Sequence, residues 1–204
     1  MAFPTTRNKN IHTAWCGINK VGQSMQTRLL KGSDASWAAE VVKERWNGPY
    51  IVSRGEIHDT RQLPGIVADD EDRAVGLLLY SHEGGDIEIV TLDALEPRRG
   101  IGRLLLDAVS ARAVEVGVKR IWLVTSNDNV GAVAFYSRCG FRLVHVWLEA
   151  ITKARSLKPQ IPLMDKNGVP IRDELEFEKR MPYQSPDPTP ASVTPAAGQP
   201  PRQP

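Results

Sequence analysis

A short segment in the middle of the chain combines two glycines with three arginines, between an apolar run and a long amphipathic stretch. Its residues are Arg98, Arg99, Gly100, Ile101, Gly102, Arg103 and Leu104. Glycines let a ligand approach the backbone closely, and the first amides of a helix have no partners within that helix. Those amides and the positive end of the helix dipole attract phosphate, and arginines add positive charge. The segment is therefore predicted to bind a diphosphate; a tight turn with solvated arginines is the plainer interpretation.

Two common phosphate-binding motifs do not fit this segment. The Walker loop ends in Gly-Lys-Ser/Thr, which is absent here. The dinucleotide-binding fingerprint needs a third glycine or an alanine where Leu105 stands, and it normally opens its domain.

A second segment downstream makes the pattern more specific. It contains Asn127-Asp128-Asn129, then Phe135-Tyr136, then Gly140-Phe141. In this order and spacing, the two segments resemble the GNAT acetyltransferase superfamily, and the resemblance extends from about Met25 to Met181. The chain looks most like small bacterial members of that family whose substrates are unassigned.

The resemblance implies that acetyl-CoA is the cosubstrate, with its pyrophosphate at residues 98–104. It also implies further cofactor contacts, from the main chain of Thr91, Leu92 and Asp93 to the pantetheine arm, and from Asn127, Asn129 and Phe135. One position departs from the family pattern. Pro97 stands where the family usually has Gln or Arg, and proline offers no N–H. Arg98 or Arg99 is expected to supply the missing cation.

Two side chains are candidates for proton transfer. A primary amine with a pKa near 10 is only about one part in a thousand neutral at pH 7, so a base assists its attack. Glu88 shares a strand face with Val90 and Leu92, neighbours that would raise its pKa, and the family commonly has a glutamate base on this strand. By resemblance, Tyr136 is the general acid that protonates the CoA thiolate. The structural alternatives are that Glu88 is a solvated or purely structural carboxylate, and that Tyr136 is an aromatic core residue beside Phe135.

The other candidate residues have structural interpretations that are at least as good. Asn129 precedes a predicted helix and can cap it. No metal site is expected, since the histidines lack ligand spacing and are interpreted as surface or packing residues: His58, His82 and His145. Three tryptophans are interpreted as core residues or as the lining of an acceptor pocket: Trp37, Trp46 and Trp147. Three glutamates on one strand face either attract a cationic acceptor or face solvent: Glu174, Glu176 and Glu178.

Helices and strands alternate around these residues. Apolar residues recur at helical spacing from Ile101 to Val116, and further helices are expected at 34–45 and 129–138. Strands are expected at 26–30, 50–53, 65–68, 74–80, 86–95, 120–125 and 141–148, and around Leu175 and Phe177. The run 120–125 is an apolar strand, with its apolar residues at 121–124, consistent with a buried parallel position. Together with the resemblance, this predicts an α/β (α+β) fold: a mixed, mostly antiparallel sheet of six or seven strands, splayed in the middle, with helices on both faces.

Composition sets the domain organisation. The chain has 204 residues, 41% hydrophobic and 25% charged, which predicts one globular domain at 25–182. Residues 1–24 are basic and contain no acid; they are a flexible extension, a transit-like segment, or the result of an upstream start codon before Met25. Residues 183–204 are rich in proline and are expected to form a disordered tail.

The same numbers exclude several function classes. A net charge of +2 is too balanced for a dedicated nucleic-acid binder, and no apolar run reaches the roughly 20 residues of a membrane helix. Two cysteines exclude a disulfide scaffold and fit a cytoplasmic location.

The sequence therefore predicts an N-acetyltransferase that transfers an acetyl group from acetyl-CoA to an amine by direct attack in a ternary complex. Its acceptor is a small-molecule or peptide amine of unknown identity, and a homodimer is expected only by analogy. The alternative is a non-catalytic CoA-binding sensor or partner-binding module on the same fold.

Overall fold

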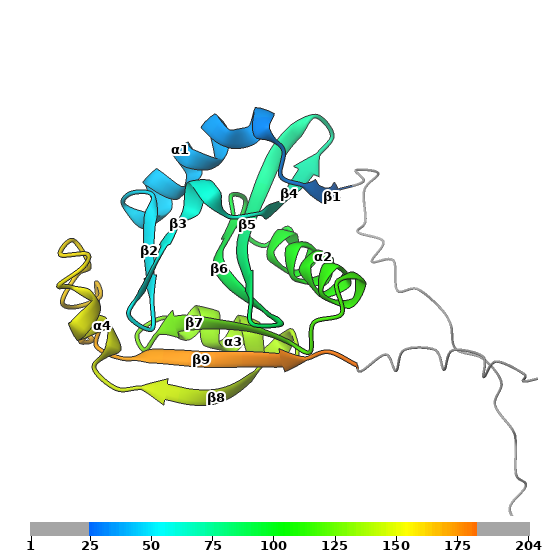
Figure 1. The fold of residues 1–204 in the computed structure, drawn as a ribbon. Helices are drawn as coiled ribbons and strands as arrows, with labels where there is room; N and C mark the ends of the chain where they lie inside the picture. The colour runs from blue at the N-terminus through cyan, green and yellow to red at the C-terminus, as the bar shows by residue number, and fades with distance from the viewer. Residues whose placement is uncertain (1–24, 183–204) are drawn as a thin grey trace, which may run out of the picture.

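The computed structural model describes residues 25–182; the predicted extension 1–24 and the proline-rich tail 183–204 lie outside the described residues. A seven-stranded sheet runs through the molecule in the order β1-β4-β5-β6-β7-β9-β8, and β2 and β3 form a separate hairpin (Figure 1). The strands are β1 Met25–Leu29, β2 Tyr50–Ser53, β3 Glu56–Asp59, β4 Gly65–Asp70, β5 Arg73–Glu83, β6 Asp86–Ala94, β7 Arg120–Ser126, β8 Arg142–Trp147 and β9 Glu174–Arg180. The α-helices are α1 Ala35–Trp46, α2 Ile101–Glu115, α3 Val130–Arg138 and α4 Ala150–Ala154.

The sheet is splayed in its centre, as predicted. All neighbouring strands are antiparallel except β6 and β7, which are parallel. That parallel pairing covers only Ile87 with Ile121 and Glu88 with Trp122, although β6 continues to Ala94 and β7 to Ser126. The mixed, mostly antiparallel and splayed sheet is therefore confirmed.

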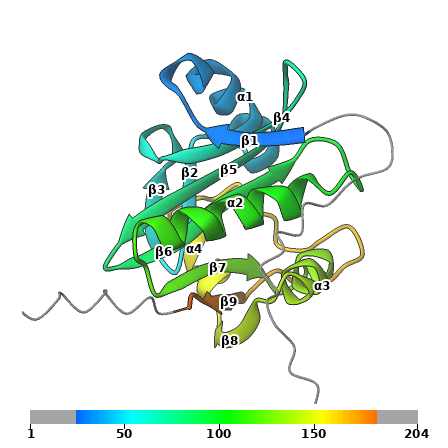
Figure 2. The ribbon, with the colours of Figure 1, turned by 90° about the vertical axis from the view of Figure 1, so that its right-hand side faces the viewer.

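Helices cover both faces of the sheet, which is also confirmed. Successive side chains of a strand point to opposite faces. On β5, Leu78 belongs to the cluster under α2, whereas Leu77 and Leu79 belong to the cluster under α1. Figure 2 shows α2 lying across β4, β5 and β6, with α1 on the far side of those strands.

Most predicted elements are present, with shifted ends. Helix α2 matches the predicted 101–116 to within a residue. Strand β4 continues two residues beyond the predicted 65–68, to Asp70. Strand β3 and helix α4 were not predicted. Strand β3 is polar except for Ile57, so it has no alternating pattern and forms through pairing with β2 alone.

The closing strand β9 differs from its predicted half-exposed state. Glu174 and Glu176 are each only 4% exposed, because the β2–β3 hairpin lies over this face of the sheet. Arg54 and Gly55 form the hairpin turn with φ of 49° and 84°, and the Arg54 guanidinium carbon lies 4.1 Å from the Trp122 ring centroid. The hypothesis of a solvated acidic strand face is thus wrong for these two glutamates.

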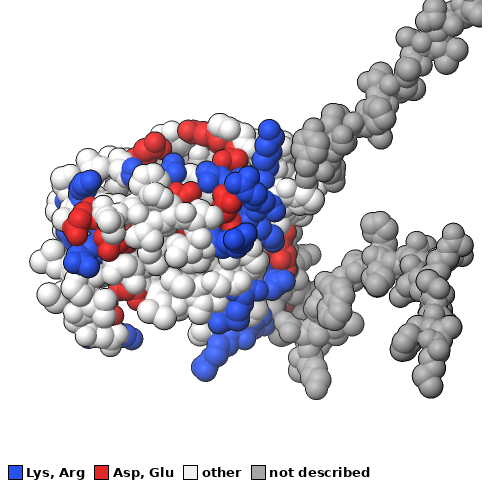
Figure 3. Space-filling model, turned by 90° about the horizontal axis from the view of Figure 1, so that it is seen from below, with Lys and Arg blue, Asp and Glu red and all other residues white. Residues whose placement is uncertain are grey.

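Strand β8 forms the outer edge of the sheet and is exposed along its whole length. The face seen from below in Figure 3 is largely uncharged, with basic side chains gathered toward one end. None of the helices described within residues 25–182 is long and apolar enough to cross a membrane.

Candidate active site

A cavity of about 290 Å³ opens where β6 and β7 part. The hairpin strand β2 and helix α4 close its sides. Its polar lining includes Ser53, Glu88, Asn129, Lys158 and Glu174. The splay of the sheet therefore creates a pocket that contains two carboxylates and one amine.

Glu88 lies at the last paired position between β6 and β7. Its Oε1 accepts a hydrogen bond of 2.5 Å from the Ser53 hydroxyl, and its Oε2 lies 3.4 Å from Nε2 of His58. Burial raises the pKa of Glu88, while the Ser53 hydrogen bond and the His58 charge oppose that rise. The His58 side chain is only 12% exposed and faces this carboxylate, so of the two predicted alternatives it is a packing residue and not a surface residue.

Glu174 is the second carboxylate of the cavity. Its Oε2 accepts a 2.9 Å hydrogen bond from the backbone N–H of Arg54. Burial raises the pKa of Glu174, and the nearby charge of Glu88 raises it further. Glu174 thus joins the hairpin turn to β9 and adds negative potential at the Glu88 end of the cavity.

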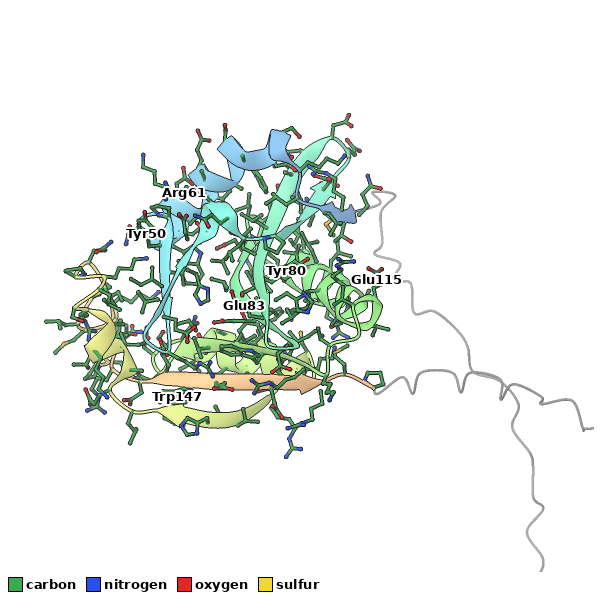
Figure 4. The ribbon with its side chains drawn as sticks, viewed as in Figure 1. Tyr50, Arg61, Tyr80, Glu83, Glu115 and Trp147 are labelled. Atoms are coloured by element: carbon green, nitrogen blue, oxygen red, sulfur yellow. The ribbon has the colours of Figure 1, made fainter. Side chains whose placement is uncertain are left out.

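Trp147 and Glu176 support the hairpin from below. The indole Nε1 of Trp147 donates a 2.8 Å hydrogen bond to Oε2 of Glu176, which also lies 3.4 Å from Nη1 of Arg54. Figure 4 shows Trp147 on β8 at the lower edge of the sheet. Trp147 is not among the residues that line the cavity, so its function here is to hold the hairpin in place.

Lys158 is buried at another part of the cavity wall, with 9% of its surface exposed. Its Nζ donates to the backbone oxygens of Trp46 at 2.5 Å and Tyr50 at 2.8 Å. Trp46 also lines the cavity, and its Nε1 donates to both carboxylate oxygens of Asp93 at 3.2 and 3.1 Å. Of the three candidate tryptophans, Trp46 alone lines this cavity, and Trp37, a residue of α1, packs against the core cluster between that helix and the sheet.

The start of α2 fits a phosphate group. Gly100 is the N-cap with φ of 82°, and no side chain caps the helix or adds a carboxylate to its first turn. The amides of Ile101, Gly102 and Arg103 therefore keep the free donors of a helix N-terminus. Leu104 was predicted to donate as well, but its N–H bonds Gly100 O at 3.0 Å, so that part of the prediction is wrong.

The three arginines of this turn have different surroundings. Arg99 forms ion pairs with Asp70 at 2.9 Å and Glu96 at 2.5 Å, contacts that hold the turn to the sheet. Arg103 pairs with Asp107 at 3.2 Å on the helix surface. Arg98 is exposed and has φ of 64°. Arg98 and Arg103 are therefore better placed than Arg99 to meet an incoming anion.

Helix α3 meets the start of α2 through an aromatic cluster. A Cβ added to Gly102 would lie 3.0 Å from Cζ of Phe135, so a larger residue here would require the Phe135 ring to shift by a few tenths of an ångström. The Tyr136 ring contacts Phe135, Phe141 and Phe177, with centroids 5.2, 5.8 and 6.3 Å apart. Burial raises the pKa of Tyr136, and the charge of Asp93 adds to that rise. Tyr136 does not line the 290 Å³ cavity.

The two asparagines of the second segment have structural partners. Asn127 Nδ2 donates to Pro170 O at 2.9 Å, and its Oδ1 accepts from the amides of Arg172 and Asp173. Its amide group thus holds the segment before β9, which conflicts with the predicted side-chain contact to a cofactor. Asn129 caps α3 by accepting from Ala132 N at 3.1 Å, and it also lines the cavity.

The edge of β6 that faces β7 is open after Glu88. Thr91, Leu92 and Asp93 pair with β5 on their other side, opposite Leu79, Leu78 and Leu77. Past Glu88 no β7 residue pairs with them within the described part of the chain. Main-chain groups on this edge are therefore available to an extended ligand.

Sequence reasoning missed two residues of this site, Ser53 and Lys158, and named a third, Glu174, only as one of three glutamates that either attract a cationic acceptor or face solvent. Ser53, Lys158 and Glu174 reach it from the hairpin, the segment after α4, and β9. No local pattern marks them, because their proximity to Glu88 arises only when the hairpin folds over the splayed sheet.

A splayed sheet with this strand order, together with a glycine turn that starts α2 without a side-chain cap, defines the class of GNAT-type acyltransferases. Residues 33–141 match the sequence profile described as "Acetyltransferase (GNAT) family". The chain belongs to this family, as the resemblance predicted.

Relatives and solved structures agree with this assignment. The chain is 37% identical to the uncharacterized protein YxbD of Bacillus subtilis over 140 residues, which are 68% of this chain and 88% of YxbD. The fold is similar to that of an IAA acetyltransferase from Bacillus cereus, with a TM-score of 0.60 and 18% identity over 77% of this chain and 99% of the other. It is also similar to a Bacillus subtilis acetyltransferase solved in complex with CoA, with a TM-score of 0.54, 18% identity and the same coverage.

Proposed function

We propose that this protein transfers the acetyl group of acetyl-CoA to an amine by direct attack within a ternary complex. The observation that carries the proposal is the opening of β6 from β7 immediately after Glu88. The free edge of β6 would receive an extended cosubstrate, and the buried carboxylate would face an acceptor in the adjoining cavity.

The residues that would hold acetyl-CoA are the main chain of residues 91–93, the amides of residues 101–103, and the side chains of Arg98 and Arg103. Helix amides and guanidinium groups suit a diphosphate, and strand amides suit the amide-bearing pantetheine arm. Acetyl-CoA supplies an acetyl group activated as a thioester. The CoA complex of the similar Bacillus subtilis acetyltransferase supports this assignment.

Glu88 is proposed as the general base. It lines the cavity, and its raised pKa brings it closer to the pH at which a base works best. The Ser53 hydroxyl fixes the orientation of its carboxylate, and His58 lies beside the other carboxylate oxygen. Glu88 would accept the proton of the incoming ammonium, directly or through a water molecule, so that the neutral amine attacks.

Tyr136 is proposed as the general acid. A phenol with a raised pKa stays protonated at neutral pH and can donate to a developing thiolate. Phe135, which packs against Gly102 at the start of α2, holds this part of α3 next to the phosphate-binding turn.

The first test is calorimetric titration of the full chain with acetyl-CoA, followed by a screen of amines for release of free CoA thiol. Saturable binding and amine-dependent thiol release are expected. A chain that binds no acetyl-CoA would defeat the proposal, whereas binding without turnover of any amine would favour the CoA-binding module.

A further inference from the structure

The acceptor cavity has two ends of opposite charge. Glu88 and Glu174 lie at the end of β2 where Ser53 and Arg54 bind them. The amine of Lys158 lies where β2 begins, on the backbone oxygen of Tyr50. A strand rises about 3.3 Å per residue, so Tyr50 and Ser53 are about 10 Å apart along β2. In Figure 4, Tyr50 lies near α1, and Trp147 lies toward the opposite end of the hairpin.

Lys158 is unusual because it is buried without a counter-ion. The ion pairs among residues 25–182 include none to Lys158. Buried charges in proteins are normally paired. Burial lowers the pKa of Lys158, and no neighbouring carboxylate opposes this effect. An anion in the cavity would complete the surroundings of this ammonium group.

Hydrogen bonding leaves Lys158 room for such an anion. An ammonium group has three protons, and Lys158 donates to two backbone oxygens, those of Trp46 and Tyr50. These two bonds also fix the amine at the cavity wall, which Lys158 lines together with Arg45. Capping the last turn of α1 explains the bond to Trp46 O but not why an unpaired charge is buried at the cavity wall.

From this arrangement we infer that the acceptor is an amino acid, whose amine faces Glu88 and whose carboxylate binds Lys158. The inference rests on the proposed function and specifies its substrate class. A carboxylate forms a charge-assisted hydrogen bond to an ammonium group, and the opposite charges at the two ends orient a zwitterion in one direction only. A cavity of about 290 Å³ lies at the lower end of the range for ligand pockets, which suits so small an acceptor.

The test compares amines that differ only by a carboxylate. The pairs are L-alanine and β-alanine against ethylamine, 4-aminobutyrate against propylamine, and L-ornithine against putrescine. The wild-type protein is expected to show a kcat/KM at least about 10-fold higher for one or more amino acids than for the matched amine, since a hydrogen bond to a charged group has about this effect.

Three variants assign that preference to Lys158. Lys158→Gln keeps donors for the two backbone oxygens but removes the charge. It is expected to bring the ratio of kcat/KM for the amino acid to kcat/KM for the matched amine close to one, mainly by raising KM for the amino acid. Lys158→Arg retains a cation and should retain part of the preference. Lys153→Gln removes an exposed lysine of α4 outside the cavity and should leave the ratio unchanged. A role limited to capping α1 would lower activity toward both members of a pair equally.

Equal use of amino acids and matched amines would overturn the inference while leaving the acetyltransferase proposal intact. A preference that survives Lys158→Gln would also overturn it. If no amine is acetylated, titration of the CoA-saturated protein with the same amino acids decides the matter. Binding that is weakened at least about 10-fold by Lys158→Gln supports the inference, and no binding by any amino acid refutes it.

Discussion

The Ser53 hydroxyl donates a 2.5 Å hydrogen bond to Oε1 of Glu88, although 35 residues separate them in the chain. This bond joins the hairpin to the central strand at the point where β6 and β7 part. It favours the charged carboxylate, whereas burial favours the neutral acid. Burial has the larger effect and raises the pKa of the proposed base, and a residue of another element limits that rise.

Replacing Ser53 with alanine should move the acid limb of the pH profile. Without the hydroxyl, the charged form of Glu88 loses a donor and its pKa rises further. Since a general base works only when deprotonated, kcat/KM should need a higher pH to reach its plateau. The measurement is kcat/KM against pH for Ser53→Ala. Ser36→Ala, an exposed position on α1, should keep the wild-type profile, and an unmoved limb in Ser53→Ala would argue against Glu88 as the base.

Glu88→Gln should lower kcat by about 10²- to 10⁴-fold, the usual contribution of a general base. The amide keeps the shape of the side chain and can still accept from Ser53. Acetyl-CoA affinity should stay near wild type, because Glu88 lines the acceptor cavity and not the turn at the start of α2. Steady-state kinetics and calorimetry give the two values. Glu83→Gln, at the exposed end of β5 (Figure 4), is the matched control.

Tyr136→Phe separates an enzyme from a CoA-binding module. The Tyr136 hydroxyl forms no hydrogen bond to another residue of the described chain, so its loss should change the melting temperature little. In an enzyme, kcat should fall by about 10²-fold or more with acetyl-CoA affinity retained. Tyr80→Phe, which removes a phenol on β5, should leave kcat unchanged. Unaltered turnover in Tyr136→Phe would exclude the phenol as the acid.

Gly76→Ala should destabilise the fold and weaken acetyl-CoA binding together. A Cβ at Gly76 on β5 would overlap Cγ2 of Ile101, the first residue of α2, and would lie 3.3 Å from Asp93 O. Overpacking of this kind lowers the free energy of unfolding by about 1–3 kcal/mol. The forced shift of Ile101 also moves the amides that would bind phosphate. Urea unfolding and calorimetry measure the two effects. Gly32→Ala, with open space around its Cβ position, should affect neither.

Local sequence patterns were sufficient for the framework of the fold and for the glycine turn at the start of α2. The apolar spacing of α2 and the glycines at its start are local, so they could be read without knowing what they pack against. The same holds for Asn129, whose capping role depends on its own helix. The splay of the sheet was predicted through the family resemblance, because nothing local marks the residue where two strands part.

The proposed acceptor site depends on contacts between distant segments. The alternation of glutamates with apolar residues predicts that Glu176 is a solvated strand residue, yet the hairpin buries it. His58 has no motif around it, and Lys158 lies in an irregular segment after α4, so neither could be assigned from spacing.

The amino-acid order alone determined most of the elements, the glycine turn and the presence of a glutamate on the central strand, because each depends on residues close together in the chain. Tertiary structure alone decided which groups surround that glutamate and where the unpaired lysine lies. Burial and charge pairing depend on what folds over a side chain, and here that cover comes from a hairpin, a short helix and the closing strand.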